Sequence, residues 1–115
     1  MRPVKLKKKH GPEWFLQRKI ISFLRFRGWF VKSTHGNIYQ SGFPDLFCTH
    51  STYGARWIEI KLPEMKGSHF TPAQLEEFPK FVANGSGIWV LTAATEREYE
   101  KLFKSPNWYT YLSWS

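Results

Sequence analysis

The stretch that most constrains the fold is ARWIEIKLP, residues 55–63. Its aromatic and β-branched residues favour an extended strand, and Pro63 ends that strand. Because successive side chains of a strand point to opposite faces, Glu59 and Lys61 share one face with Trp57. That face carries a carboxylate and an ammonium group roughly 7 Å apart along the strand. A solvated sheet face would explain the pair, and so would an active site.

Helix and strand signals follow one another in a simple order along the chain. They predict a helix over 12–27, strands over 29–34, 45–49 and 56–62, a helix over 71–84, a strand over 87–93 and a helix over 95–104. TPAQ (71–74) and TERE (95–98) open the later helices as capping sequences, and Pro79 should bend or interrupt the second helix. The order α-β-β-β-α-β-α predicts a single α/β domain over residues 12–115, with a central mixed sheet flanked by helices.

The chain is basic, with a formal net charge of +8 over 115 residues. Much of the excess lies in a basic arm, residues 1–11, which we expect to be disordered. Its cations are Arg2, Lys5, Lys7, Lys8 and Lys9. Such an arm binds phosphates without reading sequence, which predicts a nucleic-acid partner. A solubilising tail or a nuclear-localisation-like run is the alternative.

Cysteine usage and hydropathy indicate where a chain like this works. Cys48 is the only cysteine, so an internal disulfide and a cysteine zinc cluster are both excluded. No apolar run approaches the roughly 20 residues that span a bilayer, and no apolar segment follows the basic N-terminus. We therefore expect an intracellular protein of a bacterial or phage-infected cytoplasm, with no membrane partner.

Two polar residues stand on the apolar sides of the expected helices. Glu13 lies in the apolar stripe of the first helix, which is formed by Leu16, Ile20, Phe23 and Leu24. Gln74 lies near the centre of the apolar side of the second helix, which is formed by Leu75, Phe78, Phe81 and Val82. A carboxylate that faces a core must be paired, hydrogen-bonded or bound to a metal. The alternatives are a wet first helical turn for Glu13 and simple capping for Gln74.

Asp45 is the only aspartate and begins the second expected strand. Alone it reads as an ordinary turn residue. If its strand pairs with the next one through the turn at residues 51–54, Asp45 and Glu59 converge. Two carboxylates beside the Ile60 carbonyl are hard oxygen ligands of the kind that Mg²⁺ prefers. With Lys61 next to them, the set suits metal-assisted hydrolysis of a phosphodiester.

These residues form a pattern that resembles a known nuclease motif. GFPD (42–45), followed 14 residues after Asp45 by EIK (59–61), resembles the PD-(D/E)XK motif. Glu13 on the first helix and FTPAQ (70–74) at the second resemble the VRR-NUC branch of that superfamily. The match covers residues 12–90 and leaves the basic arm and the aromatic C-terminus outside it.

The resemblance implies a role for each matching residue. Asp45 and Glu59 would bind Mg²⁺ or Mn²⁺ together with the Ile60 carbonyl, and Lys61 would orient or help deprotonate the attacking water. Glu13 would act from the second shell or through a water, and Gln74 would brace Lys61 or the scissile phosphate. The implied product carries a 5′-phosphate. Small members of this kind resemble Holliday-junction resolvases, which act as homodimers on branched DNA.

The interpretation is thus a metal-dependent DNA endonuclease, selective for branched or four-way-junction DNA. A site-directed nuclease of the restriction or homing kind, a flap or nicking nuclease, and a non-catalytic nucleic-acid-binding module are the alternatives. Lys66 and His69, before the second helix, are candidate phosphate contacts, although a lone loop histidine is more often unremarkable.

Candidate dimer contacts lie outside the motif. Phe15 and Phe26 stand among Arg18, Lys19 and Arg25 on the outer side of the first helix. Aromatic residues are enriched at interfaces, which favours a dimer contact there. The aromatic C-terminus serves either the same interface or the core.

Overall fold

The computed structural model describes residues 10–34, 41–63 and 69–114. The element order is α1 (Pro12–Phe26), β1 (Phe30–Ser33), β2 (Leu46–His50), β3 (Gly54–Ile60), α2 (Pro72–Ala83), β4 (Ile88–Leu91) and α3 (Glu96–Tyr99), followed by 3₁₀ turns η3 (Glu100–Phe103) and η4 (Trp108–Trp114). The predicted α/β class and the order α-β-β-β-α-β-α are confirmed. None of the helices in these ranges combines the length and the apolar character needed to cross a bilayer.

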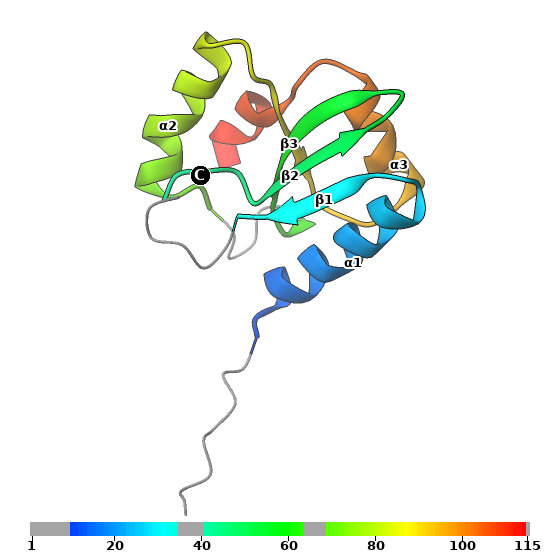
Figure 1. Cartoon of the computed structure of the whole chain (residues 1–115). Coiled ribbons are helices and arrows are strands. Elements are labelled where there is room, and N and C mark those ends of the chain that lie inside the picture. Colours follow the sequence, from blue (N-terminus) through cyan, green and yellow to red (C-terminus); the bar gives the residue numbers. More distant parts are fainter. Residues whose placement is uncertain (1–9, 35–40, 64–68, 115) are drawn as a thin grey trace, which may run out of the picture.

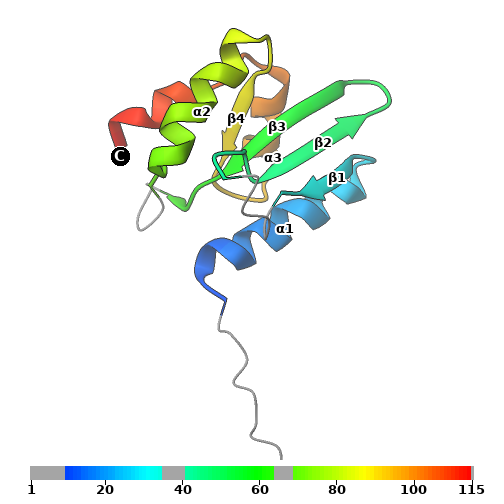
Figure 2. The ribbon, with the colours of Figure 1, turned by 60° about the vertical axis from the view of Figure 1, so that its left-hand side comes forward.

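The four strands form one mixed sheet in the order β1-β2-β3-β4. β1 and β3 both run antiparallel to β2, whereas β4 runs parallel to β3 after the crossover through α2. In Figures 1 and 2, α1 lies alongside β1, and α2 lies at the other side of the sheet, beside β4. The expected hairpin between the second and third strands is confirmed, with Leu46 opposite Ile58.

Helix α1 begins at Pro12, a position whose backbone N–H would have no partner within the helix, so proline is tolerated there. Gly28 follows the end of the helix with φ +89°. Its buried residues are Gln17, Ile20, Ile21 and Leu24. The apolar stripe was expected to include Leu16 and Phe23, but both are only half-buried. The buried face is therefore rotated slightly, which brings Gln17 under the sheet.

Each face of the sheet has its own core. Under α1, the first core joins α1 to the inward residues of the strands, such as Val31, Cys48 and Ile58. Under α2, the second core contains Phe70, Phe78, Ile88, Val90 and Trp108. Because strand residues alternate between faces, Glu59 and Lys61 lie on the α2 side, opposite Ile58 and Ile60.

Helix α2 differs from expectation in two respects. It runs without interruption through Pro79, although proline cannot donate to the carbonyl of Leu75. Leu75 is 42% exposed, so this part of the helix lies at the surface. Leu75 and Val82 were expected on the apolar side but lie at the surface, while Phe78 is fully buried.

The C-terminal region packs within the same chain. The expected last helix is shorter, because α3 ends at Tyr99 and a 3₁₀ turn continues to Phe103. In η4, Trp108 is buried in the second core and Tyr111 packs against that core. These two aromatic residues therefore finish the core, while Tyr109 is 60% exposed.

Gly42 fixes how the GFPD segment meets α2. It has φ +87°, and an added Cβ would lie 2.7 Å from Glu77 Cγ and 2.9 Å from the Ala73 carbonyl oxygen. Contacts this short do not occur for real Cβ atoms, so only glycine allows the segment to approach the first turn of α2. This approach brings Asp45 and Gln74 to the same place.

We predict that Gly42→Ala lowers the free energy of unfolding by at least about 1 kcal/mol more than Gly54→Ala. Both alanines adopt a left-handed conformation, which costs roughly 1–2 kcal/mol. Nothing lies within 4 Å of the Cβ position at Gly54, so only Gly42→Ala adds a clash with α2. Urea unfolding of both variants gives the difference, and equal losses would show that α2 shifts freely.

Candidate active site

Asp45 and Glu59 meet where β2 begins and β3 ends. The register that sets Leu46 opposite Ile58 continues one residue further and places Asp45 opposite Glu59. The backbone N–H of Asp45 donates to Glu59 Oε1 at 3.1 Å. In return, the N–H of Ile60 donates to Asp45 Oδ2 at 2.7 Å. The predicted convergence of the two carboxylates is therefore present.

Helix α2 adds Gln74 to this pair. Thr71 caps the helix, and its N–H donates to Gln74 Oε1 at 3.0 Å, which completes a capping box. The amide nitrogen of the same side chain, Nε2, donates to Glu59 Oε2 at 2.8 Å. Gln74 thus fulfils the capping role and also contacts the carboxylate, since its two ends serve different partners.

Lys61 completes what we call the carboxylate cluster, comprising Asp45, Glu59, Lys61 and Gln74. Its Nζ lies 3.0 Å from Glu59 Oε2 and donates to the His69 carbonyl at 2.9 Å. The ammonium also lies 4.7 Å from the centre of the Phe70 ring. An ammonium has three N–H donors, so these contacts leave one donor for a water or substrate oxygen.

The cluster is buried, which settles the first alternative for the Glu59 and Lys61 pair. Glu59 is 0% and Lys61 is 3% exposed, so this part of the sheet is not a solvated face. Burial raises the pKa of Glu59 well above its ordinary value, and the nearby Asp45 carboxylate raises it further. Lys61 and Gln74 offset only part of this rise. Ionising both carboxylates is therefore costly unless more positive charge is supplied.

The donor set fits one divalent cation of the Mg²⁺ type. Within residues 10–34, 41–63 and 69–114, no three His, Cys, Asp or Glu side chains are grouped to hold a metal. Mg²⁺, however, is commonly bound by one or two carboxylates, with waters and substrate phosphates as its remaining ligands. Asp45 and Glu59 provide those carboxylates, and a cation would relieve the repulsion between them.

Glu13 lies on α1, the helix that covers the other face of the sheet, and its predicted role at the metal stays a prediction. It is half-buried in the first turn of α1 and lines a hollow of about 300 Å³ together with Gln17 and Ser33. Gln17 is 7% exposed and donates to Ser33 Oγ at 3.1 Å. The sequence interpretation missed this buried residue, although its spacing from Ile20 and Leu24 places it on the buried stripe.

The remaining predicted contacts divide between described and undescribed residues. His69 has an exposed side chain, and its carbonyl, rather than its ring, contacts Lys61. The other predicted DNA contacts, Lys5, Lys7, Lys8, Lys9 and Lys66, lie outside the described residues and stay predictions.

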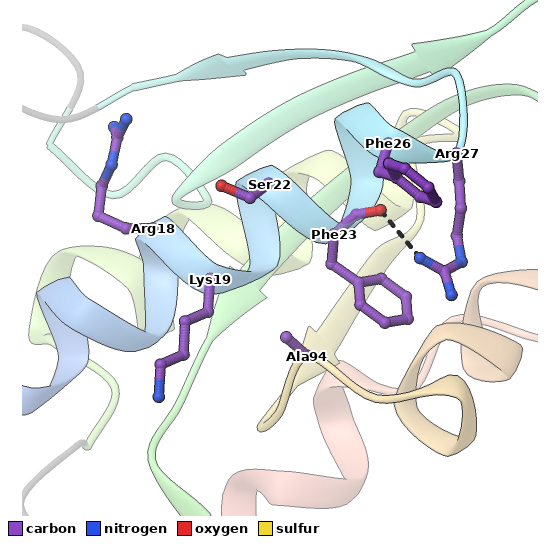
Figure 3. Close-up of a pocket in the computed structure, with 7 residues that line it drawn as sticks. All are labelled: Arg18, Lys19, Ser22, Phe23, Phe26, Arg27 and Ala94. Carbon is purple, nitrogen blue, oxygen red and sulfur yellow. Dashed lines mark hydrogen bonds between the residues drawn. The ribbon is translucent and has the colours of Figure 1, made fainter.

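A larger hollow, of about 720 Å³, lies on the outer side of α1 (Figure 3). Its lining includes the cationic and aromatic side chains Arg18, Lys19, Phe23, Phe26 and Arg27. Phe26 is 88% exposed. The Arg27 guanidinium lies 3.5 Å from the centre of the Phe23 ring and pairs with Glu96. The hollow carries no acid–base chemistry, so the carboxylate cluster is the better candidate for catalysis.

We predict that Lys61→Met lowers the free energy of unfolding by about 3 kcal/mol at pH 7 without divalent metal, because it leaves a buried carboxylate without its cation. Adding Glu59→Gln to Lys61→Met should recover most of this loss, since the double variant carries neither the Glu59 carboxylate nor the Lys61 ammonium. Lys80→Met, which breaks an exposed pairing with Glu76 and Glu77, should cost less than about 1 kcal/mol. Urea titrations measure all three variants, and a Lys61→Met cost as small as that of Lys80→Met would contradict the coupling.

Comparison with known proteins gives no family for this chain. No protein-family model, no curated protein and no solved structure matches the chain.

Proposed function

We propose that this protein is a Mg²⁺- or Mn²⁺-dependent DNA endonuclease of the PD-(D/E)XK kind, with a VRR-NUC-like domain. The observation that carries the proposal is the buried cluster in which Asp45 and Glu59 face each other, with Lys61 and Gln74 on Glu59. A cluster of this composition, with a strongly raised carboxyl pKa, is typical of catalytic rather than structural sites. The resemblance of GFPD and EIK to the nuclease motif supports the same function.

The carboxylates of Asp45 and Glu59, with the Ile60 carbonyl, would hold the metal, which supplies Lewis-acid polarisation of the phosphodiester and activation of water. Glu59 Oε1 accepts one hydrogen bond, from Asp45, and a carboxylate oxygen can accept two. Lys61 directs its remaining N–H to the attacking water or the phosphate. Gln74 keeps Glu59 oriented through its amide nitrogen.

The proposed reaction is hydrolysis of one strand. The water oxygen forms a bond to phosphorus and gives up a proton to solvent, while the bond from phosphorus to the 3′ oxygen breaks and that oxygen takes up a proton from solvent. The products carry a 5′-phosphate and a 3′-hydroxyl. The positive net charge of +8 draws the protein to the phosphate backbone, and the basic arm adds contacts that do not depend on sequence.

Branched DNA is the proposed substrate, with the four-way junction as its type case. The resemblance to small Holliday-junction resolvases supports this substrate over site-specific cleavage. The action on both strands of a junction needs two sites, which a two-fold dimer supplies. The outer side of α1, with its exposed Phe15 and Phe26, is the proposed contact.

We predict that Asp45→Asn lowers the cleavage rate in Mg²⁺ roughly a thousandfold, since the metal's stabilisation of charge is worth several kcal/mol. The substitution removes charge with little change in volume, so the protein should stay folded and should still bind DNA. The measurement is cleavage of a labelled four-way junction beside a matched linear duplex, with Mg²⁺, with Mn²⁺ and with a chelator.

Glu76→Gln serves as the matched control, because Glu76 is an exposed acid on α2 and should be dispensable. Mn²⁺ should also raise the melting temperature of the wild type and leave that of Asp45→Asn unchanged. Cleavage by Asp45→Asn at the wild-type rate would contradict the assignment of Asp45 as a metal ligand. Binding without cleavage under every metal condition would instead indicate a non-catalytic nucleic-acid-binding module.

We predict that light scattering at micromolar concentration finds twice the mass of one chain. Phe26→Glu should give the monomer, because it places a charge at the centre of the proposed contact. Val82→Glu changes a similarly exposed apolar residue on α2 and should leave the dimer intact. A strict monomer, with and without junction DNA, would instead favour a single-cut flap or nicking nuclease.

A further inference from the structure

The face of β1 and β2 that points away from α1 carries aromatic side chains at the surface. Phe30 on β1 is 57% exposed and Phe47 on β2 is half-buried, while Trp57 on β3 is half-buried against the core under α2. An antiparallel sheet face that meets solvent normally carries polar residues. Helix α2 lies beside β4 and not over β1 (Figure 2), so the core under α2 does not account for Phe30.

The strand register arranges these residues in rows across the sheet. Lys32 lies opposite Phe47, which lies opposite Trp57. The rings of Phe47 and Trp57 are 5.0 Å apart between centroids. In the next row, Phe30 lies opposite Thr49, and the Lys32 ammonium is 5.6 Å from the centre of the Phe30 ring. We call Phe30, Lys32, Phe47 and Trp57 the aromatic strip.

The aromatic strip is continuous with the carboxylate cluster. Asp45 and Phe47 are two residues apart and share a face, and so are Glu59 and Trp57. The row of Lys32, Phe47 and Trp57 is therefore next to the row of the carboxylates, roughly 7 Å away along the strands, and the row of Phe30 lies roughly 7 Å further. A base that stacks on Phe47 would have its own phosphodiester close to Asp45 and Glu59.

We propose that the aromatic strip binds an unpaired stretch of the substrate strand by base stacking and leads it into the carboxylate cluster. This inference rests on the proposed function for the identity of the bond that is cleaved. It adds to the branched substrate a need for unpaired bases beside the cleaved bond, which flaps and splayed ends offer along an arm and a four-way junction offers where its base pairs open at the crossing.

Three observations favour nucleic acid over a protein partner on this face. The strip is aromatic rather than aliphatic, and rings offer π faces on which any base can stack. Its charged residue is the cation Lys32, and the two rows contain no acidic residue. The row beyond Phe47 holds the proposed chemistry, so the strip lies on the path that a bound strand must follow.

The test is the binding of a fluorescein-labelled 20-nucleotide oligo-dT, followed by fluorescence anisotropy in a chelator so that no cleavage occurs. Phe30→Ala and Phe47→Ala should each weaken binding by at least about 5-fold, the lower end of what one stacked base contributes. Phe30→Tyr should bind within about twofold of wild type, whereas Phe30→Leu, which is apolar but has no ring, should behave like Phe30→Ala. Tyr109→Ala, a 60% exposed aromatic residue on η4, is the matched control and should have no effect.

Salt dependence separates stacking from charge. Phe30→Ala should leave the slope of log binding constant against log salt unchanged, and Lys32→Gln should reduce it by roughly 0.7 for a single strand. Because Phe30 is more than half exposed, its variants should keep the wild-type melting temperature. Unchanged oligo-dT binding by a folded Phe30→Ala protein would overturn the proposal. Dissociation of the dimer by Phe30→Ala, with Phe30→Leu as good as Phe30→Tyr, would also overturn it and assign the strip to a second copy of the chain.

The failure of this inference and that of the proposed function give different results. If the wild type cleaves flaps in Mg²⁺ and oligo-dT binding ignores Phe30, the strip is not the binding surface and the nuclease stands. If oligo-dT binding depends on Phe30 but no metal supports cleavage of any DNA, the strip stands and the nuclease does not.

Discussion

Leu46 pairs with Ile58 across the β2–β3 hairpin, and the candidate site depends on that register. A slip of one residue would turn every side chain of one strand to the other face of the sheet. Asp45 would then face α1, while Glu59 would remain under α2. Burial of residues from both strands holds this register, because Leu46 and Cys48 on β2 and Ile58 on β3 are fully buried in the core under α1.

Two further contacts lock the end of the hairpin where the carboxylates meet. Thr34, just after β1, holds the segment before β2, since its N–H donates to the Asp45 carbonyl at 3.0 Å and its hydroxyl donates to the Pro44 carbonyl. On the other side, Gly42 allows the same segment to touch α2. Asp45 is thus positioned by the edge strand and by a helix that comes much later in the chain.

The burial of Glu59 gives the cluster its chemical character. A carboxylate without solvent exposure, beside a second carboxylate, costs folding free energy that one lysine and one amide only partly offset. Apolar residues of similar volume would make a more stable core, so the arrangement is better explained by the proposed metal site, where a cation adds positive charge. The same face of the sheet continues into the aromatic strip, so the proposed chemistry and the proposed strand-binding surface share two strands.

Sequence reasoning succeeded where the signal was local or periodic. Alternation within EIK put Glu59 and Lys61 on one face, and the capping pattern of TPAQ placed Gln74 in the first turn of α2. It failed where neighbours decide the outcome. Pro79 is tolerated on the exposed side of α2, and Leu75 and Val82 are exposed because α2 is buried along a narrow line through Phe78.

The sequence by itself determined the order of the elements, the placement of Asp45 at the start of a strand, and the positive charge of the chain. These follow from side-chain alternation, helix caps and composition, which act between residues close in the sequence. Only the tertiary structure decided that Glu59 is fully buried, that Gln74 reaches it from α2, and that the helix carrying Glu13 covers the other face of the sheet. It also showed that Phe30 is more than half exposed and Phe47 half-buried on the face of β1 and β2 that points away from α1. The physical reason is that burial and contact depend on which helix covers which part of the sheet, and no local pattern encodes that.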